Sequence, residues 1–407
     1  MADFYDIHTH IMDLSHPNYI LFIKRLGLEK YLFSLYIPII SNIISAIFAS
    51  KSKRILNLLS LMDNDISDLI KIVEIKDIKP FLKNLIIDDV SFDGIVITPL
   101  LMDFGQKYSS DFDNEVWYNS TPHKAIKNQV IDVFLGIAEY VRTGFDGKLK
   151  IFPFLGLNTR NYSLKSDLNR EGNIKSVGII DLLDKYFKDF TLEEKEKREK
   201  KLLENMGNFE SIDKLSCYSF AGIKVYPPLG FDPWPDNEEE REKVKYLYNY
   251  CEKKAIPITT HCGVGGFQTV DKNTCYILAS PLRWKKVFEN YPNLKVNFAH
   301  FATSLKEWRK EILKLIVEYE NVYTDIAYVC LKERDYEVLE SEIKKLCGKG
   351  ELLEKFYSRL LFGSDFIINL LDCTSYYEYL ANFKNTRFFK GKKVLLCYEN
   401  PRKFLFG

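Results

Sequence analysis

Asp6-Ile7-His8-Thr9-His10 is the stretch on which the prediction of both the fold and the site depends. It closes a short run, residues 3–10, that has the composition of a β-strand. Side chains alternate between the two faces of an extended strand, so His8 and His10 project to the same side. Two imidazoles in this arrangement can bind a single metal ion. For each later motif of the chain, the question is whether its residues could complete this metal site.

Seven further stretches are predicted to be strands, most of them separated by sequence of helical periodicity. They cover residues 94–99, 150–156, 220–228 with its turn, 256–261, 294–300, 322–325 and 360–365. An internal proline weakens the prediction for 150–156. Helices are expected at 238–254, 281–290, 304–318 and 333–346. Eight strands alternating with helices predict an α/β fold, a (β/α)8 TIM barrel.

The 407 residues are expected to form one elaborated barrel, 1–407, because such barrels reach roughly 400 residues or more once insertions are counted. Two helical insertions are predicted, at 14–90 and at 162–216. The second contains the charged run 192–205, which Thr191 and Glu194 would open as a capping box. Its mixture of Lys and Glu is typical of a solvated helix face.

The composition narrows the class of protein and its partners. Hydrophobic residues make up 46% and aromatic residues 14%, which is ample for a large core and argues against disorder. With 57 basic and 56 acidic residues, the net charge is +1. We therefore expect the protein to bind a small molecule and not a nucleic acid. Eight scattered cysteines without a C-x-x-C pair are typical of reduced thiols. Since a metal motif at residue 8 leaves no room for a signal peptide, we expect a cytoplasmic protein.

Residues 31–50 carry no charge and have the length of a membrane span. They contain Pro38, Asn42 and four serines, and they lie between the first histidine motif and all later ones. A single crossing would place the two halves of one site on opposite sides of a membrane, so spanning is not expected. The alternatives are a buried helical hairpin, a contact in a homo-oligomer or a lid over the site.

Four of the six histidines lie at the carboxyl ends of predicted strands: His8, His10, His261 and His300. Asp365 ends the eighth strand, and Lys224 lies near the end of the fourth. The carboxyl ends of all strands of such a barrel meet at one mouth, where catalytic residues gather. Each motif alone is common by chance, but histidine is rare in this chain. The joint placement therefore favours a metal site.

These motifs resemble the amidohydrolase superfamily, and within it the amidohydrolase-related branch of metal-dependent TIM-barrel hydrolases. The matching stretches are DIHTH, GIKVYPPLGFDP, ITTHCG, NFAHFA, LFGSDF and ENPRKFLF. The resemblance spans nearly the whole chain outside the two insertions. The order H-x-H, Lys, His, His, Asp is specific to the superfamily and much less specific for the substrate.

The resemblance implies that His8, His10 and Asp365 bind one divalent metal ion, with zinc expected. His261 and His300 would bind a second ion or complete a mononuclear site. Lys224 stands where members with two ions carry a carboxylated lysine, whose carbamate supplies an anionic oxygen ligand. The alternative is a free Lys224 that pairs with Asp365 or contacts substrate.

The activity that the resemblance implies is hydrolysis of an amide, ester or lactone bond of a small substrate. Asp365 would act as the general base that takes a proton from the attacking water. The first alternative is a metal-dependent nonoxidative decarboxylase of a small carboxylic acid, with a single ion and the same aspartate. The second is a non-catalytic barrel that binds a partner through residues 31–50.

A few other residues are candidates for supporting roles. Tyr226 is a candidate for substrate contact, with packing beside proline as the alternative. Arg160 could hold a substrate carboxylate through two N–H groups, with a surface ion pair as the alternative. Asp103 and Asp325 follow strands and are candidates to orient histidines. Cys262 alternates to the face opposite His261 and is expected to be a packed thiol.

Overall fold

The computed structural model describes residues 2–17, 53–105, 126–144, 146–168, 174–209, 211, 214–215 and 217–407. The apolar stretch 31–50, for which a hairpin, an oligomer contact and a lid are the alternatives, lies outside these residues. Among the helices within them, none combines the length and the apolar character that a membrane crossing requires.

The barrel begins with β1 (Ala2–Thr9), which pairs in parallel with β3 (Val90–Pro99). The third strand position is divided by Pro153, which has no N–H to donate to a neighbouring strand. Its first part, β4 (Leu149–Ile151), pairs with β3, and its second part, β5 (Phe154–Gly156), pairs with the next strand of the barrel. The proline thus interrupts the strand without ending it.

Five further strands follow in chain order, each parallel to the next: β8 (Gly222–Val225), β9 (Ile258–Thr260), β10 (Val296–Phe298), β11 (Val322–Asp325) and β12 (Leu360–Leu361). The barrel closes between β12 and β1. The N–H of Ile7 donates to the carbonyl of Phe362 at 3.2 Å, and that of Asp365 donates to the carbonyl of His8 at 2.7 Å. The predicted (β/α)8 barrel and the order of its strands are confirmed.

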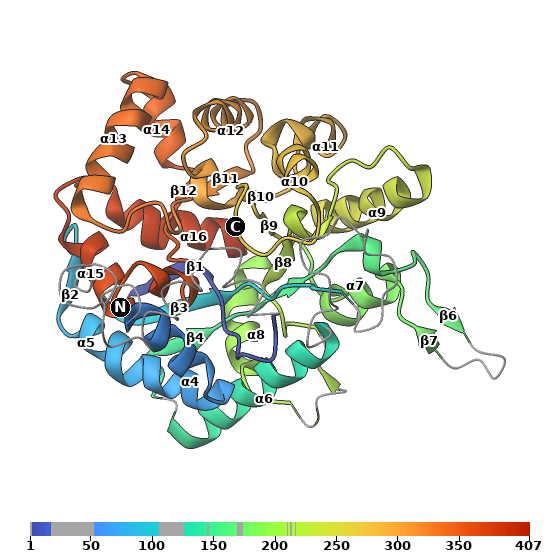
Figure 1. Cartoon of the computed structure of the whole chain (residues 1–407), viewed down its shortest axis with the longest axis horizontal. Coiled ribbons are helices and arrows are strands. Elements are labelled where there is room, and N and C mark those ends of the chain that lie inside the picture. The colour runs from blue at the N-terminus through green and yellow to red at the C-terminus, as the bar shows by residue number, and fades with distance from the viewer. Residues whose placement is uncertain are drawn as a thin grey trace, which may run out of the picture.

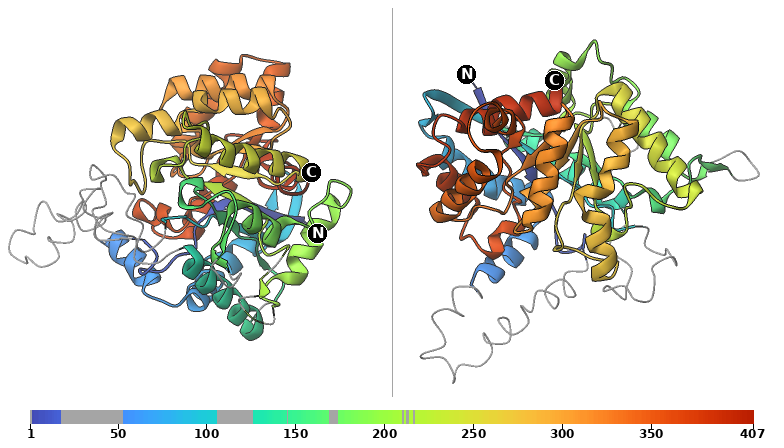
Figure 2. Two further views of the ribbon diagram at one scale, coloured as in Figure 1. Left: turned by 90° about the vertical axis from the view of Figure 1, so that its right-hand side faces the viewer. Right: turned by 90° about the horizontal axis from the view of Figure 1, so that it is seen from above.

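Helices surround the strands on the outside (Figures 1 and 2). Four of them fall where the periodicity predicts helices: α9 (Glu238–Lys254), α11 (Lys285–Asn290), α12 (Lys306–Glu318) and α13 (Glu333–Cys347). α9 matches its prediction at both ends. The side chain of Asn237 accepts from the N–H of Glu240 at 3.0 Å and so caps its start. Its end is fixed by Ala255, which has a positive φ of 47°.

The remaining α-helices among the described residues are distributed along the chain. They are a helix at 53–62, α4 (Ile66–Val73), α5 (Lys79–Leu82), α6 (Ile126–Gly144), α7 (Ile179–Phe187), α8 (Arg198–Asn205), α10 (Lys272–Ala279), α14 (Glu351–Tyr357), α15 (Tyr376–Asn385) and α16 (Asn400–Phe406). Two π-helical segments, Glu74–Ile78 and Leu395–Glu399, lead into α5 and α16.

The helical prediction for 14–90 is wrong at its carboxyl end. β2 (Leu85–Ile87) pairs antiparallel with the start of β3 and forms a hairpin with it. The two turn residues, Asp88 and Asp89, have positive φ angles of 42° and 67°. Positive φ at both central positions is the requirement of a type I′ turn, whose twist matches that of the paired strands.

The insertion at 162–216 also differs from its prediction. Its residues Asp167–Leu168 and Ile174–Ser176 form a short antiparallel pair, β6 and β7. The charged helix, α8, begins at Arg198 and not after Thr191. Of the predicted capping box, the bond from the N–H of Glu194 to the Thr191 hydroxyl is present at 3.3 Å, and the Thr191 carbonyl accepts from the Arg198 guanidinium at 2.8 Å.

The Lys and Glu side chains of the charged run are exposed or half-buried where they are described, as expected of a solvated face, and Arg198 is an exception. Its side chain is buried, and its guanidinium donates to the carbonyls of Lys254 and Ala255 at the end of α9. Carbonyls at the end of a helix have no N–H group of the next turn to accept from, and the arginine supplies hydrogen bonds to these two. The charged run therefore ties the insertion to the barrel.

Candidate metal centre

The closure of the barrel brings His8, His10 and Asp365 together. Nε2 of His8 lies 3.4 Å from Oδ1 of Asp365, and Nε2 of His10 lies 3.2 Å from the same oxygen. Ligand atoms bound to one zinc ion at its usual distances are about 3.0–3.4 Å apart. The three buried side chains are therefore spaced as ligands of one ion would be.

His261 and His300 join this group from the ends of β9 and β10. Nε2 of His300 lies 3.2 Å from Nδ1 of His261. The ring of His300 is also close to that of His8, with 4.7 Å between the centroids. Lys224 is buried on the neighbouring strand β8. The structure thus gathers all six residues that the sequence places at strand ends.

Oxygen acceptors fix the tautomer of three of the histidines. Nδ1 of His10 lies 2.9 Å from the carbonyl of Leu100, and Nδ1 of His300 lies 2.9 Å from the carbonyl of Ala327. A carbonyl can only accept, so each Nδ1 carries the proton and each Nε2 keeps a lone pair. His8 is held in the same way by a carboxylate. This is the tautomer that offers Nε2 to a metal.

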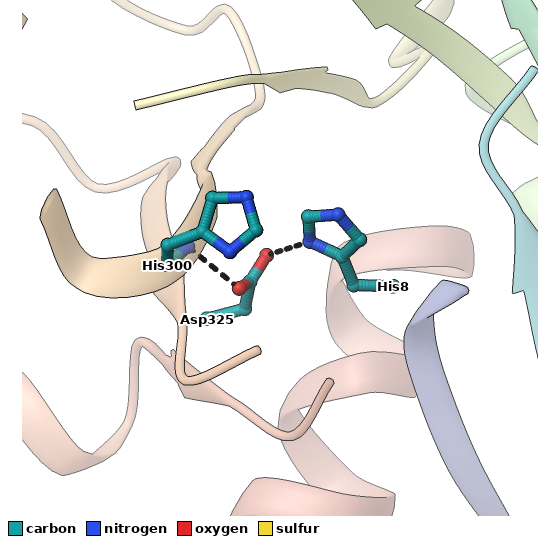
Figure 3. A group of neighbouring side chains, drawn as sticks. All are labelled: His8, His300 and Asp325. Atoms are coloured by element: carbon teal, nitrogen blue, oxygen red, sulfur yellow. Dashed lines mark hydrogen bonds and ion pairs between the residues drawn. The ribbon is translucent and has the colours of Figure 1, made fainter. Parts of the chain in front are cut away.

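That carboxylate belongs to Asp325 at the end of β11, which lies between His8 and His300 (Figure 3). Its Oδ2 is 3.0 Å from Nδ1 of His8 and accepts from Nδ2 of Asn297 at 2.7 Å. Its Oδ1 accepts from the backbone N–H groups of His300 at 2.8 Å and Ala327 at 3.0 Å. With both oxygens engaged, Asp325 orients ligands and is not placed to be one. The prediction that it orients histidines is confirmed.

Burial and neighbouring groups together set the pKa values of these residues. It lowers the pKa of His261 well below its ordinary range and that of His300 to about 4, so both stay neutral. Burial raises the pKa of Asp365, but its close contacts with His10 and His8 outweigh that effect and hold this pKa well below its usual range. Burial lowers the pKa of His8, and the Asp325 carboxylate more than reverses the effect. His261 and His300 as neutral imidazoles, and Asp365 as an ionised carboxylate, are thus in the forms that bind a metal.

Three buried polar atoms at the mouth have no hydrogen-bond partner among the described residues: Nε2 of His8, Nε2 of His261 and Nζ of Lys224. Each unsatisfied atom of this kind costs about 1–3 kcal/mol, so such atoms call for a specific explanation. A divalent ion would use the two ring nitrogens as ligands. The residues present therefore fit such an ion.

A cavity of about 250 Å³ lies over these residues. Its lining includes the polar residues His10, His261, His300 and Asp365. It also includes apolar and aromatic side chains: Met102, Tyr226, Phe267, Tyr328, Ile368 and Leu371. A small substrate with an apolar portion next to its reacting group would match this lining.

Tyr226 lines this cavity, with its ring centroid 4.5 Å from that of His261. Arg160 is not among the lining residues. The 3₁₀ turn Thr159–Asn161 directs it outward, where its side chain is exposed and lies against Gly230. The structure thus brings one of the two predicted substrate contacts to the site.

The prediction that Asp103 orients a histidine is wrong. Its carboxylate accepts from the N–H groups of Gly105 and Asn158 at 3.0 and 2.9 Å, and from Nδ2 of Asn161 at 3.0 Å. Asp103 therefore fixes the turn that follows β5. A carboxylate after a strand can bind any nearby donor, and the backbone of the adjacent loop is closer than the imidazoles.

Sequence reasoning missed Tyr328 and Phe267 as lining residues. Tyr328 lies three positions after the end of β11, and its hydroxyl donates to Asp372 at 2.5 Å. The rule that mouth residues follow strand ends could have found it. Phe267 lies in the loop after β9, seven residues beyond the end of the strand, and no local signal marks it.

A separate group consists of Asp13, His16 and Asp132. Nε2 of His16 lies 3.1 Å from Oδ2 of Asp132 and 3.7 Å from Oδ2 of Asp13. Both carboxylates are partly exposed to solvent. The His16 imidazole contacts both carboxylates directly, so we assign no metal to this group.

Residues 210–407 match the family model described as Amidohydrolase. No curated protein matches the chain.

Similar solved structures include a 5-carboxyvanillate decarboxylase from Novosphingobium aromaticivorans, with 9% identity over 99% of this chain and 97% of that one and a TM-score of 0.47. Another is a 4-oxalomesaconate hydratase from Rhodopseudomonas palustris, with 12% identity over 99% and 95% and a TM-score of 0.46. A probable 2-pyrone-4,6-dicarboxylic acid hydrolase from Acinetobacter baumannii has 11% identity over 100% and 99% and a TM-score of 0.44. The residues that match this family model, 210–407, include Lys224, His261, His300 and Asp365, so this part of the chain is similar to amidohydrolases.

Proposed function

We propose that the protein is a metal-dependent hydrolase that cleaves an amide, ester or lactone bond of a small substrate. The observation that supports this most strongly is the convergence of His8, His10 and Asp365 at 3.2–3.4 Å, next to a cavity. Neither an aspartate nor a histidine is needed there to stabilise a barrel. Such a group is expensive to bury unless it binds something.

His8, His10 and Asp365 would hold one divalent ion, and His261 and His300 would hold a second or complete a mononuclear site. Nitrogen and carboxylate ligands at these spacings suit zinc. When bound, the ion would lower the pKa of a coordinated water to near neutrality and polarise the substrate carbonyl.

The chain's own residues would transfer the proton, contact the substrate and exclude bulk water. The ionised Asp365 accepts the proton of the attacking water and passes it to the leaving group. Tyr226 contacts the substrate from the lining of the cavity. The apolar side chains of this lining receive the apolar portion of the substrate and keep bulk water from the reacting group.

We also propose that Lys224 is carboxylated, and its carbamate would supply an anionic oxygen ligand to the metal site. Its Nζ is buried without a partner among the described residues. Burial lowers its pKa to about 8, although Asp325 and Asp365 oppose the shift. A neutral amine is the form that reacts with carbon dioxide, and the resulting carbamate is an anion that a metal can bind.

The test is to measure the metal content of the full chain and then its turnover. A panel of amides, esters and lactones with small apolar substituents is assayed for hydrolysis, and the matching carboxylic acids for release of carbon dioxide. We expect one or two ions per chain and hydrolysis. Carbon dioxide release without hydrolysis would identify a decarboxylase, and failure to retain stoichiometric metal would contradict both activities.

Asp365→Asn then tests the role of the carboxylate. We expect turnover to fall by about 10²–10⁴, the usual contribution of a general base, while the circular dichroism spectrum is unchanged. Asp181→Asn, which alters an exposed carboxylate on α7, is the control and should keep full activity. An active Asp365→Asn variant would refute the assignment.

A further inference from the structure

Four consecutive residues after β10, from His300 to Thr303, have positive φ angles of 64°, 40°, 55° and 50°. None of them is glycine. In this region the Cβ of an L-residue crowds the following carbonyl, so such a run persists only where the surroundings hold it. The turn carries His300 at its start, and its last residue, Thr303, lines the cavity.

Arg309 holds this turn from the outside. It lies in the first turns of α12, and its side chain is buried. Its Nε donates to the carbonyl of Phe301 at 3.1 Å, and its Nη2 donates to the carbonyl of Thr303. The guanidinium also lies over the ring of Phe301, 5.0 Å from the centroid. One side chain thus contacts two of the four strained residues.

The charge of Arg309 is matched on its other side by Glu342 of α13. Nη1 of Arg309 donates to Oε2 of Glu342. Because a guanidinium is planar and its N–H groups point in fixed directions, three acceptors around it hold it in a single orientation. A lysine ammonium has no such fixed fork. The arrangement therefore specifies an arginine.

The inner side of the turn is fixed independently. The N–H of His300 donates to Asp325, and Nδ1 of His300 bonds to the carbonyl of Ala327. Together the inner and outer bonds leave the His300 ring one orientation, with Nε2 directed at the group formed by His261 and His8.

We propose that Arg309, held by Glu342, is a positioning residue that keeps the turn 300–303 left-handed and so aims Nε2 of His300 into the site before any ion is bound. The inference rests on the proposed function, because it takes His300 to be a metal ligand. Arg309 itself touches neither the ion nor the substrate.

The test compares Arg309→Ala with Arg359→Ala in the full chain. Arg359 is a matched control, since it too is buried and bonds to backbone carbonyls and to one glutamate, Glu320. It lies before β12, at the end of the barrel opposite the mouth. Both variants should lower the midpoint of thermal unfolding. Only Arg309→Ala should weaken zinc binding, by about 10- to 100-fold in a competition titration.

Arg309→Lys keeps the charge and the apolar stem but loses the planar arrangement of N–H groups. Its zinc affinity should therefore lie between those of the wild type and Arg309→Ala. Glu342→Gln is used if the alanine variant does not fold, and it should weaken zinc binding in the same direction. Equal zinc affinities in the wild type and the variants of Arg309 and Glu342 would overturn the proposal.

A metal-free measurement separates this inference from the proposed function. Crystal structures of the metal-free wild type and Arg309→Lys should show that residues 300–303 leave the positive-φ region only in the variant, with loss of the His300–Ala327 bond. An unchanged turn in the variant would overturn the role of Arg309. If the wild type bound no metal and the turn still changed, the proposed function would fail and the positioning role would stand.

Discussion

Nδ1 of His8 lies 3.0 Å from Oδ2 of Asp325, a residue 317 positions further along the chain. Both groups are buried, and the same carboxylate also binds the backbone N–H of His300. One aspartate therefore orients two proposed ligands that come from different strands. Its own pKa is lowered because its interactions with His8 and His300 outweigh the effect of burial.

We expect Asp325→Asn to weaken zinc binding by about 10- to 100-fold, because a neutral amide orients His8 and His300 less firmly than a carboxylate does. The measurement is a competition titration with a chromophoric chelator. Asp103→Asn is the control, since Asp103 is an equally buried carboxylate that contacts none of the histidines through its hydrogen bonds. Equal zinc affinity in the two variants would contradict the orienting role.

Lys224 should show a carbamate by ¹³C NMR when the protein is prepared in labelled bicarbonate. The amine is buried and lacks a hydrogen-bond partner among the described residues. Carboxylation would convert it into a carbamate, whose oxygens a metal ion can bind. Lys224→Met should lack the signal and lose one ion from a two-ion site. If the wild type gives no signal and holds one ion, Lys224 is a free lysine.

Arg198→Ala should lower the free energy of unfolding by about 3 kcal/mol, because it leaves the carbonyls of Thr191, Lys254 and Ala255 without their buried donor. Urea denaturation followed by circular dichroism provides the measurement. Arg142→Ala is the comparison, since the side chain of Arg142 is 72% exposed and pairs with Glu139 on the same helix. Its effect should stay within about 0.5 kcal/mol. Similar losses in the two variants would show that Arg198 is no more than a surface residue.

Asp103 should make stability depend on pH between about 4 and 6. Burial raises the pKa of its carboxyl to about 6 in the folded chain, from an ordinary value of 3.8, although several hydrogen bonds act against the shift. The folded state therefore binds the proton more tightly than the unfolded state. This stabilisation is fully present below about pH 4 and is lost as the pH rises through about 6.

Asp103→Asn removes that titration. The free energy of unfolding of the wild type, relative to the variant, should fall by about 2–3 kcal/mol between pH 4 and pH 6. The two proteins are compared by urea denaturation at several pH values. A difference that does not vary with pH would show that the carboxyl titrates normally.

The sequence by itself determined the barrel and the members of the candidate site. Strands such as 94–99 and 322–325 are marked by local composition, and the carboxyl ends of parallel strands in a closed barrel must meet. For this reason His8, His261 and Asp365 could be assigned to one mouth without knowledge of any distance. Local sequence also predicted both ends of α9, because the residues that start and end this helix lie within it or next to it in the chain.

Only the tertiary structure decided what the buried charges do. Arg198 and Arg309 belong to helices whose sequences are largely polar, and nothing nearby in the chain shows that each satisfies carbonyls in another segment. Asp103 and Asp325 both follow strands, yet only Asp325 reaches histidines. A side chain's hydrogen-bond partners are set by which donors and acceptors the packed fold brings within about 3 Å. Those partners lie from 6 positions away, as for Arg309 and Thr303, to 317 positions away, as for His8 and Asp325.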